Sequence, residues 1–194
     1  MSLTEIAPGL RRWTARHEEW KEDVGCVAVD TDDGLVLIDP LDPPHELGRP
    51  EHVLVTLFFH ARSAKAPNVW AHERIVRRLA SRGVEVNHPF AAGDELPGGI
   101  QAFQTARASE LVYWLPSQKA VVVGDVLLGA GAKPHATDDP LRLCPERWLE
   151  GATYDDLRES LTPLLGLPVV RVLPSHGKPV LRGGARALAT VLAG

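Results

Sequence analysis

An apolar run that ends abruptly in polar side chains constrains this chain most. His52–Leu57, with the sequence HVLVTL, is rich in β-branched and apolar residues, which is typical of a buried strand. The residues that follow include His60, Arg62 and Ser63. A loop at the carboxyl end of a buried strand can present side chains to a cleft. The pattern therefore predicts a core strand followed by a loop that carries a functional site.

A pair of strands is expected earlier in the chain. Val24–Asp30 and Gly34–Asp39 are apolar runs on either side of a short polar segment, and the Asp-Gly step at its end supplies the positive φ that a tight turn demands. Pro40 prevents the second strand from continuing. Further strands are predicted at 9–17, 100–106, 111–115, 120–123 and 169–173, and helices at 69–82, 145–165 (in two pieces) and 184–193.

Composition limits the classes of protein to consider. The chain has 194 residues, of which 44% are hydrophobic and 24% charged, which suits a single domain over 1–194. A net charge of -4 without a basic stripe predicts no nucleic-acid partner, and no apolar run is long enough for a membrane span. Two cysteines and the absence of a signal-like N-terminal pattern predict a cytoplasmic protein. A homodimer remains open.

Three stretches, taken in order, resemble the metallo-β-lactamase superfamily. They are the loop Thr56–Ser63, the strand end VVVGD (Val121–Asp125) and the turn VLPSHG (Val172–Gly177). The resemblance covers roughly residues 20–180, and it implies an α+β fold, the four-layer αβ/βα sandwich. In that family the aspartate of the Gly-Asp strand end, matched here by Asp125, bridges two metal ions, and the histidine of the last turn, matched by His176, is a ligand. Asp39, at the end of the LVLID strand, would buttress the metal loop.

The family's metal motif is incomplete in this chain. The family writes His-x-His-x-Asp-His after the first core strand, and Phe58 stands at its first histidine. Arg62 stands at the aspartate, Ser63 at the final histidine, and Ala106 where another ligand histidine belongs. Of the family's seven ligands, the resemblance leaves three counterparts: His60, Asp125 and His176.

The losses raise the question of whether any metal ion binds. A catalytic zinc needs three protein ligands, and an arginine at a ligand position is a permanent cation. The first hypothesis is therefore that no metal is tightly held and that the guanidinium of Arg62 pairs with Asp125 in a bidentate ion pair. Two alternatives stay open. One zinc or iron ion could be held by His60, Asp125 and His176, or two ions could be held with a replacement ligand such as Glu110.

The resemblance implies a hydrolase acting on a small ester, lactone, thioester or amide. His60 would be the base and Arg62 an oxyanion or carboxylate clamp, with Asp125 and His176 as supports. Without metal, Ser63 beside His60 could be a nucleophile, with Asp125 orienting the imidazole. Two competing hypotheses remain. The chain could be a pseudoenzyme, a non-catalytic protein that binds a small anionic molecule in the same cleft, or it could be a purely structural domain.

Overall fold

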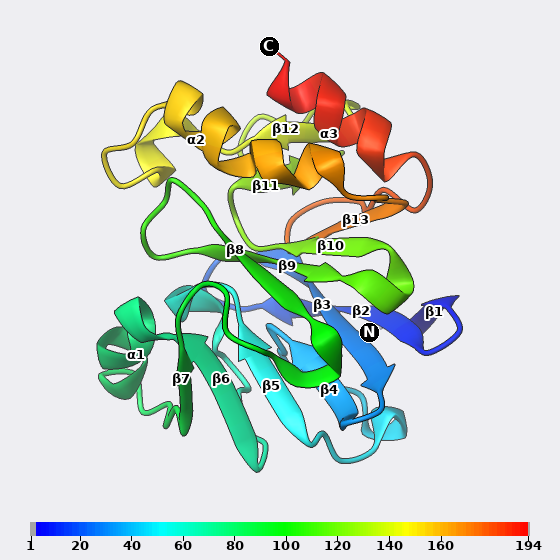
Figure 1. Cartoon of the computed structure of the whole chain (residues 1–194), viewed down its shortest axis with the longest axis vertical. Coiled ribbons are helices and arrows are strands. Elements are labelled where there is room, and N and C mark those ends of the chain that lie inside the picture. The colour runs from blue at the N-terminus through cyan, green and yellow to red at the C-terminus, as the bar shows by residue number, and fades with distance from the viewer. Residues whose placement is uncertain (1–2, 194) are drawn as a thin grey trace.

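Two β-sheets pack face to face between outer helices in the computed structural model, which describes residues 3–193 (Figure 1). The first sheet has seven strands in sequential order: β1 (Leu3–Ala7), β2 (Leu10–His17), β3 (Glu22–Thr31), β4 (Gly34–Ile38), β5 (His52–Val55), β6 (Asn68–His72) and β7 (His88–Phe90). The second has the order β13-β10-β9-β8, from β8 (Gln101–Gln104), β9 (Leu111–Leu115), β10 (Ala120–Val123) and β13 (Arg171–Pro174). A small separate sheet pairs β11 (Leu127–Gly129) with β12 (Leu141–Leu143).

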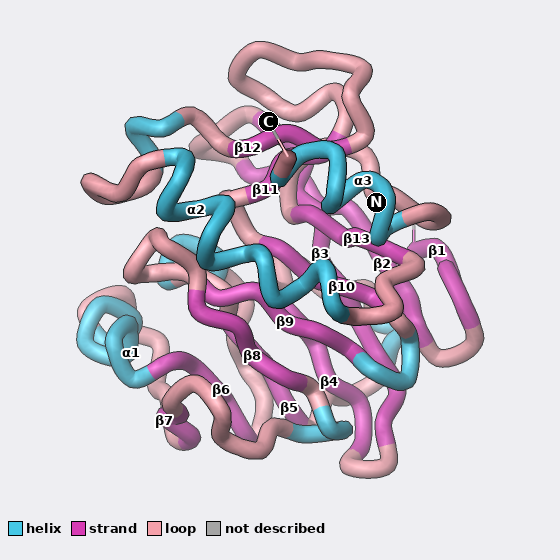
Figure 2. The backbone as a smooth tube through the Cα atoms, turned by 45° about the horizontal axis from the view of Figure 1, so that its top comes forward, coloured by secondary structure: helices cyan, strands magenta, loops and turns pink. Residues whose placement is uncertain are grey.

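Three helices complete the layers: α1 (Glu73–Ala80), α2 (Tyr154–Leu161) and α3 (Gly184–Leu192). Ile75 and Leu79 of α1 pack against Val53 and Val55 on the outer face of the first sheet. Helices α2 and α3 lie across the outer face of the second sheet, as Figure 2 shows. The result is the expected four-layer arrangement of helices, sheet, sheet and helices.

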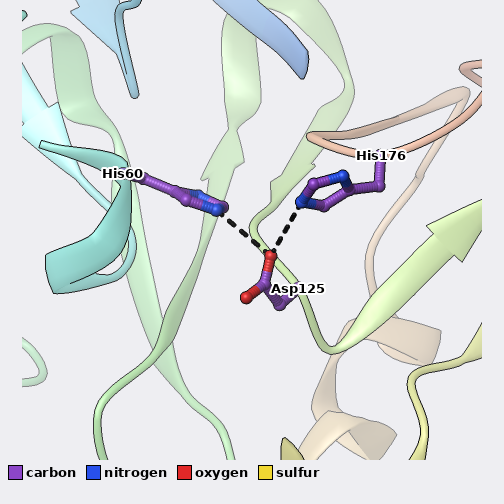
Figure 3. A group of neighbouring side chains, drawn as sticks. All are labelled: His60, Asp125 and His176. Atoms are coloured by element: carbon purple, nitrogen blue, oxygen red, sulfur yellow. Dashed lines mark ion pairs between the residues drawn. The ribbon is translucent and has the colours of Figure 1, made fainter. Parts of the chain in front are cut away.

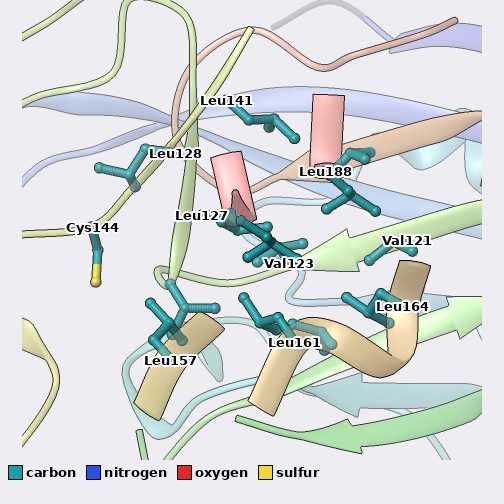
Figure 4. Close-up of a cluster of buried hydrophobic side chains, with 14 of the residues drawn as sticks. Val121, Val123, Leu127, Leu128, Leu141, Cys144, Leu157, Leu161, Leu164 and Leu188 are labelled. Carbon is teal, nitrogen blue, oxygen red and sulfur yellow. The ribbon is translucent and has the colours of Figure 1, made fainter. Parts of the chain in front are cut away.

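Alternation along each strand sorts the side chains into three apolar layers. Along β10, Val121 and Val123 face α2 and α3, whereas Val122 faces the other sheet. Figure 4 shows the outer layer, in which Leu161 of α2 and Leu188 of α3 meet these valines. Because successive side chains of a strand point to opposite faces, an all-apolar strand such as β10 is buried on both sides.

The predicted strand pair is confirmed, and two predicted helices are shorter than expected, since only Tyr154–Leu161 of the segment 145–165 is α-helical. Strands β3 and β4 form an antiparallel hairpin around the Asp-Gly turn. The helix expected over 69–82 begins only at Glu73, because residues 68–72 form strand β6, parallel to β5. His72 then caps the helix by accepting a hydrogen bond from the Arg74 backbone N–H (3.2 Å). Within residues 3–193, no helix has the length and apolar character to cross a membrane.

Tyr113 ties the two sheets together, and its removal gives a first prediction. Its buried hydroxyl on β9 donates to the Val55 carbonyl oxygen on β5 (2.8 Å). Tyr113→Phe leaves that carbonyl without this partner, so we expect the free energy of unfolding to fall by about 1–2 kcal/mol. Urea denaturation measures the change. Tyr154→Phe is the control, because it removes a hydroxyl that accepts an exposed hydrogen bond from the Glu146 backbone N–H. Equal losses of unfolding free energy in both variants would contradict the expectation.

Candidate metal centre

Parallel strands bring the candidate site residues to one edge of the sandwich. Strands β4 and β5 run parallel in the first sheet, as do β10 and β13 in the second. Asp39 follows β4, and His60 lies in the short 3-10 turn Phe58–His60 after β5. Asp125 comes just after β10, and His176 just after β13. Since the carboxyl ends of parallel strands meet at the same edge, these side chains converge although they are far apart in sequence.

His60, Asp125 and His176 meet around one carboxylate oxygen (Figure 3). His60 Nε2 lies 3.1 Å from Asp125 Oδ1, and His176 Nε2 lies 3.2 Å from the same oxygen. One ligand atom from each residue lies within 4.8 Å of the others, and all three residues are buried. The geometry thus brings together the three ligand counterparts that the sequence predicted.

Each imidazole has a second carboxylate on its far side. His60 Nδ1 lies 2.9 Å from Asp39 Oδ2, and Asp39 also accepts hydrogen bonds from the backbone N–H and the hydroxyl of Thr56. His176 Nδ1 lies 3.6 Å from Glu22 Oε2. A carboxylate that faces one ring nitrogen directs the lone pair of the other ring nitrogen inward, which is the usual outer shell of a metal-binding histidine. The contact between Asp39 and His60 therefore supports the expectation that Asp39 buttresses the metal loop.

Arg107, which the sequence analysis did not single out, is the cation beside Asp125. Its Nη1 donates to Asp125 Oδ2 (3.0 Å) and to Glu110 Oε2 (3.2 Å). The other oxygen of Glu110 accepts from the backbone N–H groups of Asp125 (2.7 Å) and Val126 (3.0 Å). Glu110 is thus engaged in holding the Asp125 loop and Arg107 rather than facing the two histidines.

The predicted pairing of Arg62 with Asp125 is wrong. Within residues 3–193, Arg62 makes no ion pair with Asp125, and its three buried guanidinium nitrogens have no hydrogen-bond partner. Its Cζ lies 5.4 Å from the ring centroid of Trp20 instead. The backbone N–H of Ser63 donates to the Pro40 carbonyl oxygen (3.0 Å), which bends this loop toward the segment after β4. The Arg62 guanidinium lies over Trp20 and not in an ion pair with Asp125.

Ser63 does not lie beside His60, as its predicted role as a nucleophile requires. Its hydroxyl accepts from the backbone N–H of Asp42 (3.2 Å), and no described contact joins it to His60. The hydroxyls near His60 are those of Thr56 (3.3 Å) and Ser175 (3.5 Å), both on the Nδ1 side that faces Asp39. A nucleophile–histidine–aspartate set therefore does not form around Ser63 in the described chain.

Charge balance shows what the three converging side chains require. Four carboxylates and two guanidinium groups surround the site, those of Glu22, Asp39, Glu110, Asp125, Arg62 and Arg107. With every carboxylate ionised, these six groups lack two positive charges; Glu150, whose side chain is 31% exposed and pairs with Arg107, lies outside this count. Buried charges are stable only when they are compensated. Two protons, one on each imidazole, or one divalent metal ion would supply the missing charge, whereas two divalent ions would exceed it.

The pKa shifts follow the same electrostatics. Burial opposes protonation of His176, but the neighbouring carboxylates of Asp125 and Glu22 raise its pKa to about 9. Burial also acts against a charged His60, and the carboxylates of Asp125 and Asp39 raise its pKa above the ordinary value. Burial, together with the neighbouring Asp125 charge, raises the pKa of Glu110 to about 7. The carboxylates therefore favour positive charge at both imidazoles.

The residues present fit one metal ion better than two. The buried atoms His60 Nε2 and Asp125 Oδ1 both lack a well-formed hydrogen bond, although they lie close together. Two imidazoles and one carboxylate are a ligand set that zinc and iron accept. The other oxygen of Asp125 accepts a hydrogen bond from Arg107, whose positive charge opposes the binding of a second cation there.

A cleft of about 540 Å³ opens beside this centre. Asp125, His176 and Arg107 reach it, and Trp20 and Trp148 form apolar parts of its wall. Lys133 and Arg147 are exposed at its rim, and neither makes an ion pair within the described residues. A cavity of this size suits a small molecule, and the free cations favour one with an acidic group.

Sequence reasoning missed Arg107 and Glu22. Arg107 stands next to Ala106, the position of a missing ligand, and three residues before Glu110. This spacing could have indicated an ion pair of Arg107 with Glu110 near the site. Glu22 lies at the start of β3, and only the packing of the two sheets brings it to His176. No spacing in the sequence indicates that contact.

Comparison with solved structures identifies the fold. A metallo-β-lactamase from Pontibacter korlensis is similar with a TM-score of 0.69 at 18% identity, over 99% of this chain and 98% of that one. One from Erythrobacter litoralis has a TM-score of 0.69 at 14% identity, over 98% and 95%. One from Pseudomonas aeruginosa, solved in a mono-zinc form, has 0.67 at 14% identity, over 99% and 94%. No protein-family model and no curated protein matches the sequence. The chain has the metallo-β-lactamase fold.

Asp39 provides a test of how the outer carboxylates hold the site. Asp39→Asn removes the charge facing His60 Nδ1 while keeping the size of the side chain. We expect zinc affinity to fall about 10- to 100-fold, as for other outer-shell partners of metal-binding histidines. Competition with a chromophoric chelator measures this affinity. Asp32→Asn, at an exposed turn position, is the control, and a change within about twofold at Asp39 would contradict the assignment.

Proposed function

We propose that this chain is a hydrolase that uses one divalent metal ion, held by His60, Asp125 and His176, to cleave small esters, lactones, thioesters or amides. The observation that carries the proposal is the convergence of two imidazole nitrogens on one buried carboxylate oxygen, at 3.1 and 3.2 Å. The fold supports it, because the solved structures it resembles are metallo-β-lactamases. Zinc and iron are both compatible with this ligand set.

The chemistry divides between the ion and the side chains. A divalent ion in this position would polarise a substrate carbonyl and lower the pKa of a water molecule. Asp39 and Glu22 hold the imidazoles in the binding orientation. Arg107 fixes the Asp125 carboxylate, and Trp20 forms part of the wall along which an apolar substrate group would lie.

The cations at the rim of the cleft limit the class of substrate that we expect. Lys133 and Arg147 add positive charge to a cleft on a chain whose net charge is -4. Once a divalent ion supplies the two positive charges that the centre lacks, these rim cations give the cleft an excess of positive charge, which concentrates anions there. We therefore expect substrates that carry an acidic group in addition to the bond that is cleaved.

A binding protein without turnover is the second candidate function. Two protons in place of the ion would also satisfy Asp125, and they would convert both imidazoles to imidazolium. His60 would then have no lone pair with which to act as a base. The cleft and its free cations would remain a site for a small anionic molecule.

Hydrolysis assays separate the two functions. Zinc-loaded, iron(II)-loaded and chelator-treated protein should be assayed against small esters, lactones, thioesters and amides, with and without a carboxylate. Turnover is expected only in a metal-loaded form, and it should be lost in His176→Ala. His45→Ala, at an exposed histidine that pairs with Glu46 and not with any residue of the centre, is the matched control. Turnover that survives removal of the metal would contradict the proposal, and binding without turnover in every form would favour the second candidate.

A further inference from the structure

Three carboxylates surround the guanidinium of Arg107. Its Nη1 lies 3.0 Å from Asp125 Oδ2 and 3.2 Å from Glu110 Oε2, and its Nε lies 3.6 Å from Glu150 Oε1. The Arg107 side chain is only 7% exposed. A single positive charge therefore sits in a largely buried pocket of three acidic groups.

These carboxylates have anchors other than Arg107. Glu110 Oε1 accepts the two backbone N–H bonds described above, from the loop that carries Asp125. Ser109 donates its hydroxyl to Glu150 Oε1 (2.6 Å). Asp125 Oδ1 faces the two histidines. The pocket is thus built by its own hydrogen bonds, and the guanidinium fills it.

We infer that Asp125, Glu110 and Glu150 form a second cation site, that Arg107 occupies it permanently, and that Arg107 thereby limits the chain to one metal ion. The inference rests on the proposed function in that the first ion is the one held by the two histidines. A guanidinium stays charged at any pH a protein tolerates, so it cannot leave the pocket to a metal ion by losing its proton.

The donor set defines which ion would take the vacated pocket. All three groups offer oxygen, and oxygen-only sites select hard cations such as Mn²⁺, Mg²⁺ and Ca²⁺. The first site contains two imidazoles, which suit zinc. The two sites therefore differ in the ion they prefer, and this difference allows each to be measured separately.

Arg107→Ala tests the inference. Zinc-loaded wild type and variant are equilibrated with Mn²⁺, desalted and analysed for both elements. We expect one zinc and no Mn²⁺ per wild-type chain, and one zinc plus one Mn²⁺ per variant chain. Excess Mn²⁺ should also raise the unfolding midpoint of the variant by about 5–10 °C, with no comparable effect on wild type.

Two further variants serve as controls. Arg107→Lys keeps a positive charge in the pocket and should bind no Mn²⁺. Arg78→Ala removes the other arginine near Glu150, which lies 3.7 Å away on the exposed side, and should also bind none.

Each remaining outcome counts against a specific claim. The inference is overturned if Arg107→Ala binds no Mn²⁺, if it fails to fold with and without Mn²⁺, or if wild type binds two ions. Wild type without zinc would instead refute the proposed function, and Mn²⁺ uptake by Arg107→Ala would still report on the second site.

Discussion

Asp125→Asn should lower zinc affinity by more than about 100-fold and abolish metal-dependent hydrolysis. Asp125 is the one negatively charged member of the three-residue set, and both histidines face its Oδ1. Substitution of an outer-shell partner alone costs about 10- to 100-fold in affinity, so the loss of a direct anionic ligand should cost more. The competing-chelator titration measures the affinity, and initial rates on an active substrate measure the hydrolysis.

The substitution has a matched control and a clear contrary result. Asp23→Asn removes a carboxylate that is largely exposed and pairs with Arg16 at the surface, so it should leave zinc binding unchanged. Zinc affinity within about tenfold of wild type in Asp125→Asn would show that the ion, if it binds, is held elsewhere.

Glu110→Ala should lower the free energy of unfolding by about 3–5 kcal/mol, the largest stability effect we expect from this site. The Glu110 side chain is fully buried and pairs with Arg107. Its loss would leave the backbone N–H groups of Asp125 and Val126 without their acceptor and remove one counter-ion of a buried guanidinium. Urea denaturation of the metal-free protein isolates this effect from ligand binding.

Two further variants show why Glu110→Ala should lower the free energy of unfolding. Glu110→Gln keeps an oxygen acceptor for the loop but loses the charge, so its loss of stability should be smaller. Glu159→Ala, at an exposed position of α2, should change stability by less than about 0.5 kcal/mol. A cost below about 1 kcal/mol for Glu110→Ala would mean that the loop and Arg107 do not depend on this carboxylate.

The sequence predicted the parts of the fold that local patterns determine. The hairpin of β3 and β4 follows from two apolar runs and an Asp-Gly turn, and the helices after the sheets follow from their periodicity. Residues 69–72 were predicted helical because Trp70 fits a helical spacing with Ile75, Val76 and Leu79. Pairing with β5 overrides that preference, and no local pattern reveals it.

The candidate site divides in the same way. The three matching stretches predicted that His60, Asp125 and His176 lie together, and they do. Each residue follows a core strand, so its position depends on the order of the strands in the fold. The contact of Arg62 with Trp20 joins residues that lie far apart in sequence, so only the folded chain shows it. The guanidinium that pairs with Asp125 is that of Arg107, a residue that the sequence did not single out.

The number of metal ions per chain distinguishes a mononuclear centre from a dinuclear one and from a cluster completed by protons. Purified protein loaded with excess zinc, desalted and measured by elemental analysis should contain one zinc per chain, and His176→Ala should contain none under the same conditions. Two zinc ions per wild-type chain would show that Arg107 leaves room for a dinuclear centre. A wild-type chain that retains none would show that protons, and not a metal ion, complete this cluster.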